Sequence, residues 1–366
     1  MQNFQLGPSE VRLSRVIHGC MGFAPASARE TIRTLHAAFD AGITSFDTAP
    51  LYGFGESESV LGQAISDRRH QVQILTKVGL CWDSDHGQVL FEFEDAPGHR
   101  RSVRKDSRPA SLRRQVEASL RRLKVDVIDL LQVHHVDIET PLGATTEVLA
   151  ALVREGKIRA IGLSNVTVAQ ADQARQLLHP TPLAALQLEY NLLNRRIERD
   201  LLPWAGGHVV PVLAYSPLAQ GILAGRQLAG GPPPADWRAG GAYFAPGNIR
   251  IANHGLVHAV APMAKQRLVE PGPLSLAWLL RQPGIGAVIA GARTPAQARA
   301  NAAAIDVTLA DEELRTLAAA FAGFDLEAGR QRPGLLQRGI RRVRARVGRL
   351  LTRTWPRTTT NRDRPT

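Results

Sequence analysis

The sequence predicts an α/β fold, a (β/α)8 TIM barrel with an N-terminal β-hairpin and a basic C-terminal extension. Three observations predict it. Eight short apolar segments alternate with segments of helical spacing. The apolar segments are continuous, as in parallel strands covered on both faces. The length of 366 residues also suits one barrel with insertions.

The chain opens with a predicted hairpin over residues 4–6 and 11–13, joined by Gly7-Pro8-Ser9. The eight predicted strands that follow are residues 16–20, 44–47, 73–77, 127–134, 160–164, 186–189, 209–215 and 287–290. Helical spacing is clearest over residues 31–40, 111–123, 142–155 and 167–177. Gly42 and Gly156 follow two of these helices, where a left-handed residue ends a helix.

A doubly wound open sheet is the alternative fold, because it also alternates strands and helices. That fold usually carries GxGxxG after its first strand. Here the first strand runs into Gly19-Cys20-Met21-Gly22, so the barrel is favoured.

Two long connections interrupt the repeat. Residues 219–265 contain Gly230-Gly231-Pro232-Pro233-Pro234 and predict a structureless loop that acts as a functional lid. Residues 91–108 are polar and charged and lie between the third strand and its helix. They predict a longer rim loop that could cover a substrate.

Composition excludes several classes of protein. With 44% hydrophobic and 21% charged residues, the chain is not disordered throughout. Cys20 and Cys81 cannot build a multi-disulfide scaffold, and their spacing is not a zinc pattern, so we expect no metal site and a reducing, cytoplasmic setting. The N-terminus lacks a signal-peptide pattern, and no apolar run approaches the roughly 18 residues of a spanning helix.

The net charge of +12 is concentrated at the C-terminal end. Residues 330–366 hold twelve arginines and one acid, Asp363, and so carry +11 of it. The first 329 residues are close to neutral, which argues against a specific nucleic-acid partner for the body of the protein. We therefore divide the chain into a barrel over residues 1–324 and an extension over 325–366.

The extension has the pattern of a basic amphipathic helix. Leu336, Ile340, Val343 and Val347 fall on one side of a helical wheel, and most of the arginines fall on the other. Such a helix would make peripheral contact with an anionic membrane or an acidic partner. A mostly disordered extension whose charge does little is the alternative.

Four ionisable side chains follow three neighbouring strands. Asp47 and Tyr52 follow the second strand, Lys77 the third and His134 the fourth. Because the carboxyl ends of barrel strands share one rim, these groups should converge there. An isolated phenol, with a pKa near ~10, is a poor acid at neutral pH.

We expect the Lys77 ammonium to lower the pKa of Tyr52, and Asp47 to keep buried Lys77 charged. His134 would donate a hydrogen bond to a substrate oxygen. This set predicts protonation of an oxygen while another group attacks its carbon.

Six segments, in this order, resemble the aldo/keto reductase family: FDTAPLYG (46–53), TKVG (76–79), VIDLLQVH (127–134), GKIRAIGLSN (156–165), AYSPLAQG (214–221) and IAGARTPAQ (289–297). The resemblance covers residues 4–317. It implies a barrel that binds a nicotinamide nucleotide and reduces the carbonyl of a small aldehyde or ketone.

The resemblance also assigns roles by position. Tyr52 matches the general acid, and Asp47, Lys77 and His134 match the other three catalytic positions. The positions that match the nicotinamide and pyrophosphate sites are Ser164, Asn165, Gln187, Tyr215, Ser216, Leu218, Gln220 and Gly221. His135 adjoins the catalytic histidine, but neighbouring strand residues point to opposite faces, so we assign His134.

The last strand matches the adenosine end of the nucleotide site. Arg293, after Gly291, matches a basic residue that binds the 2′-phosphate, which predicts NADPH/NADP+ as the cofactor. Gln297 and Asn301 would face the adenine from one helical stripe; two solvated polar residues are the alternative.

Two functions fit this pattern. The first is an NADPH-dependent carbonyl reductase. The second is a cofactor-sensing regulatory subunit with a reductase-like barrel and little turnover. The four intact polar groups favour the first.

Overall fold

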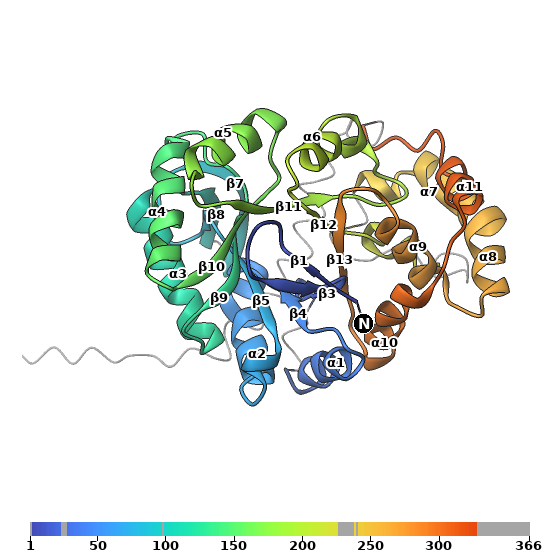
Figure 1. The fold of residues 1–366 in the computed structure, drawn as a ribbon, viewed down its shortest axis with the longest axis horizontal. Helices are drawn as coiled ribbons and strands as arrows, with labels where there is room; N and C mark the ends of the chain where they lie inside the picture. The colour runs from blue at the N-terminus through green and yellow to red at the C-terminus, as the bar shows by residue number, and fades with distance from the viewer. Residues whose placement is uncertain (1, 23–27, 97–98, 226–237, 239–240, 328–366) are drawn as a thin grey trace, which may run out of the picture.

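Eight parallel strands close into a barrel surrounded by helices in this computed structural model, which describes residues 2–22, 28–96, 99–225, 238 and 241–327 (Figure 1). The predicted fold class is confirmed, and each predicted strand overlaps an observed one. The barrel strands are β3 (Val16–Gly19), β4 (Ser45–Asp47), β5 (Gln73–Val78), β9 (Ile128–Val133), β10 (Ile158–Ser164), β11 (Leu183–Glu189), β12 (Val212–Tyr215) and β13 (Ile285–Gly291).

The barrel closes between its last and first strands, where Val288 pairs with Val16 and Ile289 with Ile17. The predicted N-terminal hairpin is also present, as β1 (Asn3–Gln5) and β2 (Arg12–Ser14). Leu6 and Leu13 of this hairpin segment are fully buried in a cluster with apolar side chains of the strands. The hairpin therefore covers the amino-terminal end of the barrel and leaves the carboxyl-terminal rim for function.

The four predicted helices are confirmed within a few residues. The α-helices are α1 (Ala28–Asp40), α2 (Glu56–Ala64), α3 (Pro109–Leu123), α4 (Leu142–Arg154), α5 (Val168–Leu178), α6 (Leu201–Gly207), α7 (Pro246–Gly255), α8 (Ala261–Gln266), α9 (Pro271–Leu280), α10 (Pro295–Ala303) and α11 (Asp311–Ala319). Shorter helical turns are η2 (Tyr52–Gly55), η3 (Arg69–Gln71), η4 (Arg196–Arg199), η5 (Ala219–Gly221), η7 (Ala242–Phe244), η8 (Leu256–Val260) and η9 (Ala304–Asp306). Gly42 and Gly156 have φ of 89° and 72°, as their capping role requires.

The prediction of a structureless loop over residues 219–265 is wrong for much of its length. α7, η8 and α8 form an almost continuous helical segment there. Ala252, Leu256, Val260 and Ala264 recur every four residues and are buried, so one apolar face packs onto the rest of the protein. The neighbouring glycines and prolines concealed this spacing, and residues 226–237 and 239–240 lie outside the described part of the chain.

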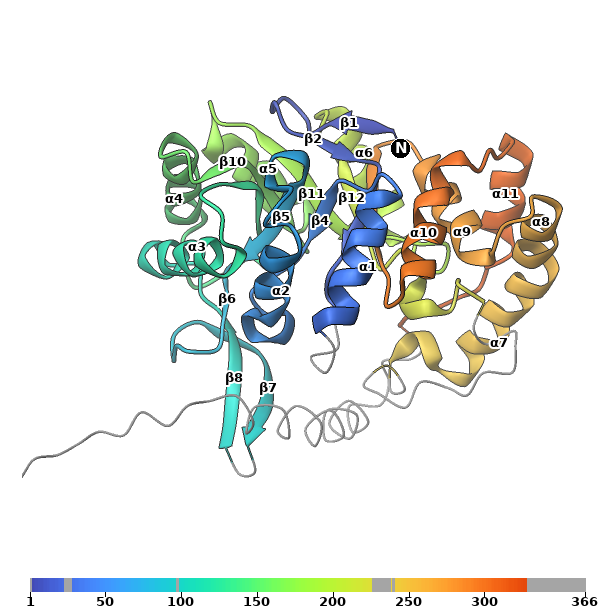
Figure 2. The same ribbon diagram turned by 90° about the horizontal axis from the view of Figure 1, so that it is seen from below.

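The predicted rim loop over residues 91–108 is instead largely a β-ribbon. β7 (Gln88–Ala96) and β8 (His99–Lys105) pair antiparallel, and β8 also pairs antiparallel with the short strand β6 (Leu80–Cys81). The ribbon projects away from the barrel (Figure 2). Its many charged residues point to a loop, but a two-stranded ribbon with both faces largely in solvent accommodates them equally well.

The basic helix predicted for the extension lies outside the described residues, which end at residue 327. The proposed boundary between residues 324 and 325 stays a prediction. Among the residues that the structure describes, none of the helices is both long and apolar enough to cross a bilayer.

Gly62 sets how closely the helix after the Tyr52 turn approaches its neighbour. A Cβ atom at this position of α2 would lie 2.4 Å from the carbonyl oxygen of Leu123, at the end of α3. We expect Gly62→Ala to lower the free energy of unfolding by about 2 kcal/mol or more, because backbone must move. Urea denaturation measures this.

The matched control is Gly247→Ala in α7, where a Cβ atom would meet nothing within 4 Å. It should change the free energy of unfolding by about 1 kcal/mol or less. Equal effects of the two substitutions would contradict the packing argument.

Candidate active site

A buried ion pair lies at the centre of the carboxyl-terminal rim. Asp47 ends β4 and Lys77 lies near the end of the adjacent strand β5, so their side chains meet. The Lys77 Nζ lies 2.6 Å from Asp47 Oδ1, and the two residues are 1% and 3% exposed. A buried charge is stable only with close partners, so this pair constrains both strand ends.

Two glutamines hold the second oxygen of Asp47. Gln187 Nε2, from β11, donates to Asp47 Oδ2 at 2.8 Å, and Gln132 Nε2, from β9, lies 3.3 Å from the same atom. Gln187 was predicted to contact the cofactor, and here its side chain is directed at the carboxylate. Gln132 was not predicted as a site residue. The sequence feature that could have identified it is a polar amide among the apolar residues at the end of β9.

Tyr52 lies against the ion pair. It begins η2, where the next three residues, 53–55, all have positive φ and turn the chain sharply into α2. Lys77 Nζ donates to the Tyr52 hydroxyl at 3.3 Å and to the Thr48 carbonyl at 2.9 Å. With Asp47 these use all three ammonium hydrogens. The Tyr52 oxygen accepts from Lys77, and no acceptor among the described residues takes its own hydrogen.

The net effect on the Tyr52 phenol differs from our expectation. Burial raises the pKa of Tyr52 above its usual 10, and the lowering effect of Lys77 does not fully offset this. The prediction that Tyr52 has a lowered pKa is therefore wrong, and its phenol stays protonated at neutral pH. Burial also lowers the pKa of Lys77, but Asp47 and Tyr52 outweigh it and the pKa is raised, as predicted for a lysine kept charged by Asp47.

His134 completes the group. Its ring meets the Tyr52 ring edge-on, with centroids 6.1 Å apart and an interplanar angle of 85°. Burial, together with the nearby charge of Lys77, lowers the pKa of His134 well below 6.5. The imidazole is therefore neutral at pH 7 and has one N–H to donate.

His135 does not point away from His134. β9 ends at Val133, so strand alternation no longer applies, and the two imidazoles stack with centroids 5.5 Å apart. The argument from opposite faces is therefore wrong, although the assignment of His134 by motif position is unaffected. Burial and the charge of Lys105 lower the pKa of His135 to about 4.

Asn165 links the histidines to the end of β12. Its Nδ2 donates to the His134 carbonyl at 3.0 Å and lies 3.1 Å from Ser164 Oγ. The Tyr215 hydroxyl donates to Asn165 Oδ1 at 2.8 Å. Ser164 Oγ in turn donates to the Gln187 carbonyl at 2.9 Å. The four residues predicted to surround the nicotinamide thus form one connected set beside His134.

The segment after β12 has an unusual backbone. Ser216, Ala219 and Gln220 have φ of 50°, 48° and 59°, a conformation that costs energy in residues other than glycine. The buried Gln220 Oε1 has no hydrogen-bond partner among the described residues. An amide oxygen accepts hydrogen bonds, as phosphate oxygens do, so only a group that donates would satisfy this atom.

The end of β13 exposes a free guanidinium. Arg293 is exposed, lies near Gly22 and pairs with no carboxylate among the described residues. Its backbone N–H donates to Gln297 Oε1 at 2.8 Å. Asn301 is 5% exposed and donates to the Gly291 carbonyl at 3.2 Å. Gln297 and Asn301 therefore hold the turn that presents Arg293, and Asn301 is not solvated.

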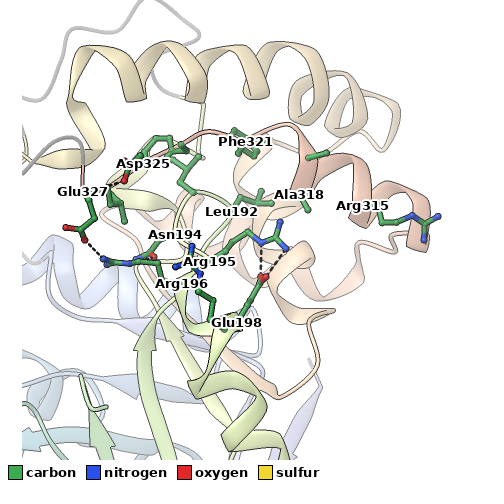
Figure 3. Close-up of a pocket in the computed structure, with 16 residues that line it drawn as sticks. Leu192, Asn194, Arg195, Arg196, Glu198, Arg315, Ala318, Phe321, Asp325 and Glu327 are labelled. Carbon is green, nitrogen blue, oxygen red and sulfur yellow. Dashed lines mark hydrogen bonds and ion pairs between the residues drawn. The ribbon is translucent and has the colours of Figure 1, made fainter. Parts of the chain in front are cut away.

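A cavity of about 880 Å³ lies apart from this site (Figure 3). It is lined by residues 192–196, 198 and 199 and by residues between 315 and 327, with ion pairs between Arg195 and Glu198 and between Arg196 and Glu327. None of the four predicted catalytic residues lines it. We therefore assign the candidate site to the rim of the barrel.

The fold and this rim define a barrel oxidoreductase, and comparisons with known proteins agree. The model of the aldo/keto reductase family matches residues 15–321. The chain is 34% identical to the NADH-specific methylglyoxal reductase of Escherichia coli (strain K12), covering 86% of this chain and 96% of that protein. It is also 34% identical to the aldo-keto reductase YhdN of Bacillus subtilis (strain 168), covering 79% and 82%.

A solved structure agrees as well. The glycerol dehydrogenase of Gluconobacter oxydans matches with a TM-score of 0.76 and 34% identity, covering 87% of this chain and 94% of that one. This chain belongs to the aldo/keto reductase family.

The buried histidines predict how stability depends on pH. Burial lowers the pKa of His18 to about 4, and that of His135 to about 4. Between pH 6.5 and 4 the unfolded chain binds protons that the folded chain does not, so stability is present above pH 6.5 and lost as the pH falls. We expect the free energy of unfolding, measured in urea at pH 7.0, 5.5 and 4.5, to decrease.

His135→Gln should make this decrease shallower, because one of the neutral imidazoles is gone. Carboxylates contribute to the same loss in both proteins, so the comparison isolates the histidine. An identical pH dependence in the two proteins would show that His135 plays no part.

Proposed function

We propose that this protein is an NADPH-dependent reductase of aldehyde or ketone carbonyls in which Tyr52 donates the proton. The observation that carries the proposal is the hydrogen bonding of Tyr52. Its oxygen accepts from the charged Lys77, whereas its own hydrogen has no acceptor among the described residues. A protonated phenol with a free hydrogen and a cation behind its oxygen is suited to act as a general acid.

A reduced nicotinamide, when bound, supplies the hydride that adds to the carbonyl carbon. The chain supplies the matching proton: as the C=O double bond becomes a C–O single bond, Tyr52 transfers its hydrogen to the oxygen. The phenolate that remains is stabilised by the Lys77 ammonium, which Asp47 holds in place. Neutral His134 would donate its N–H to the same carbonyl oxygen and orient it toward Tyr52.

Three groups of residues would hold the nucleotide. Ser164, Asn165, Gln187 and Tyr215 would surround the nicotinamide. Ser216, Leu218, Gln220 and Gly221 would contact the pyrophosphate, and the left-handed backbone of Ser216 and Gln220, which turns the chain there, supports this. Arg293 would bind the 2′-phosphate from the turn held by Gly291, Gln297 and Asn301.

Removing the phenol oxygen tests the catalytic role. We expect Tyr52→Phe to lower kcat/KM at least about a hundredfold, the lower range for loss of a general acid. The measurement is NADPH oxidation with a panel of small aldehydes, ketones and quinones. Tyr190→Phe is the control: it removes a hydroxyl that donates to Glu198 and not to any of the four predicted catalytic residues, so it should keep its rate.

Unchanged turnover in Tyr52→Phe would contradict the proposal. Tight nucleotide binding by the wild type without turnover of any compound in the panel would instead support the cofactor-sensing alternative.

The free guanidinium predicts the choice of nucleotide. We expect Arg293→Ala to weaken NADPH binding about tenfold or more and NADH binding less than about twofold, because only NADPH carries the 2′-phosphate. Fluorescence titration with each nucleotide measures both dissociation constants. The relative from Escherichia coli is named as NADH-specific. An Arg293→Ala variant that binds both nucleotides like the wild type would show that Arg293 does not bind the 2′-phosphate, and tighter binding of NADH than of NADPH by the wild type would contradict the choice of NADPH.

A further inference from the structure

We infer that Tyr243 is a positioning residue for nucleotide binding, acting through Asn191 on the backbone of Ser216. The inference rests on the proposed function, which places the nucleotide against the segment that starts at Ser216. It concerns a tyrosine that the catalytic group does not use and that lies far along the chain, in η7.

A series of buried hydrogen bonds connects Tyr243 to Ser216 through Asn191. The Tyr243 hydroxyl donates to Glu189 Oε1 at 2.9 Å and accepts from Asn191 Nδ2 at 2.9 Å. The other hydrogen of Asn191 Nδ2 goes to the Ser216 carbonyl at 3.0 Å. Asn194 Nδ2 holds the second oxygen of Glu189 at 3.1 Å. Tyr243, Asn191 and Asn194 are all buried, so water does not replace these bonds.

Asn191 has no spare hydrogen-bonding capacity. Its Oδ1 accepts from the backbone N–H groups of Leu193 and Asn194, both at 2.9 Å, which fixes the orientation of the amide. Both of its N–H hydrogens are therefore directed at Tyr243 and Ser216. If the Tyr243 oxygen is lost, one hydrogen of Asn191 and one oxygen of Glu189 remain unpaired in a buried place, and the turn must rearrange.

Ser216 needs such support. Its φ of 50° is costly for a residue with a side chain, and it must be held by the surroundings. The preceding residue is held as well, because the Tyr190 N–H donates to the Tyr215 carbonyl at 3.3 Å. The Tyr215–Ser216 corner presents the ring predicted to stack on the nicotinamide and the turn predicted to meet the pyrophosphate. A small shift here changes nucleotide affinity.

Tyr243 is itself anchored from the other side. Its ring lies 5.9 Å from that of Phe324. Asn248, in α7, donates to the carbonyls of Ala242 and Asp325 at 2.8 and 2.7 Å. Asp325 lies on the cavity wall beyond α11 (Figure 3). The hydroxyl is thus held at a fixed position by segments before and after α7, as a positioning residue requires.

None of these hydrogen bonds includes Asp47, Tyr52, Lys77 or His134. Loss of the Tyr243 hydroxyl should therefore weaken nucleotide binding and leave the chemical step intact. A merely structural tyrosine would instead change stability without a selective effect on affinity.

The test is fluorescence titration of wild type and Tyr243→Phe with NADPH and NADH. For the nucleotide that the wild type binds more tightly, we expect the dissociation constant to rise about tenfold. The kcat at saturating nucleotide should stay within about threefold. Asn191→Ala should give a similar rise, and the double variant no more than either single one, because both residues act through one connection.

The matched control is Tyr190→Phe. Tyr190 is also buried, and its hydroxyl donates to Glu198 outside this set, so its removal should leave the dissociation constant within about twofold. An affinity of Tyr243→Phe within twofold of wild type would overturn the inference, as would equal losses in the two tyrosine variants. A wild type that binds neither nucleotide would overturn the proposed function, and the inference with it.

Discussion

The buried pair of Asp47 and Lys77 is the interaction on which the rest of the site depends. Removing two charges from water is expensive, and the attraction between them compensates only if the remaining atoms are also satisfied. Here Thr48, Tyr52, Gln132 and Gln187 complete the hydrogen bonds, with partners contributed from β4, β5, β9 and β11. Only a closed barrel brings these strand ends around one carboxylate, so fold and site share one constraint.

The ion pair also determines the protonation states around it. A cation that can only donate leaves the oxygen of Tyr52 as an acceptor and its hydrogen available. Burial keeps that phenol protonated, and burial with the same positive charge keeps His134 neutral. One charged group, one neutral acid and one neutral donor thus lie together. This is the distribution that proton transfer to a carbonyl oxygen requires.

Outside this centre, the rim depends on hydrogen bonds that stabilise residues in an energetically unfavourable backbone conformation. Asn165 and Ser216 both have positive φ, and each is fixed by a side chain from another segment, Tyr215 in one case and Asn191 in the other. Such positions are sustained only when their surroundings over-determine them. The connection through Tyr243 extends this support to the chain between β12 and α9, which a view limited to the strand ends overlooks.

The sequence by itself determined the eight strands, the capping glycines and the residues at the strand ends, because apolar periodicity and left-handed glycines are local properties of the chain. It also placed Asp47, Tyr52, Lys77 and His134 on one rim. Only the tertiary structure decided that burial outweighs Lys77 at Tyr52, that His134 and His135 stack, and that Gln132 and Gln187 meet at Asp47. These features depend on desolvation and on contacts between distant segments, which no local pattern encodes.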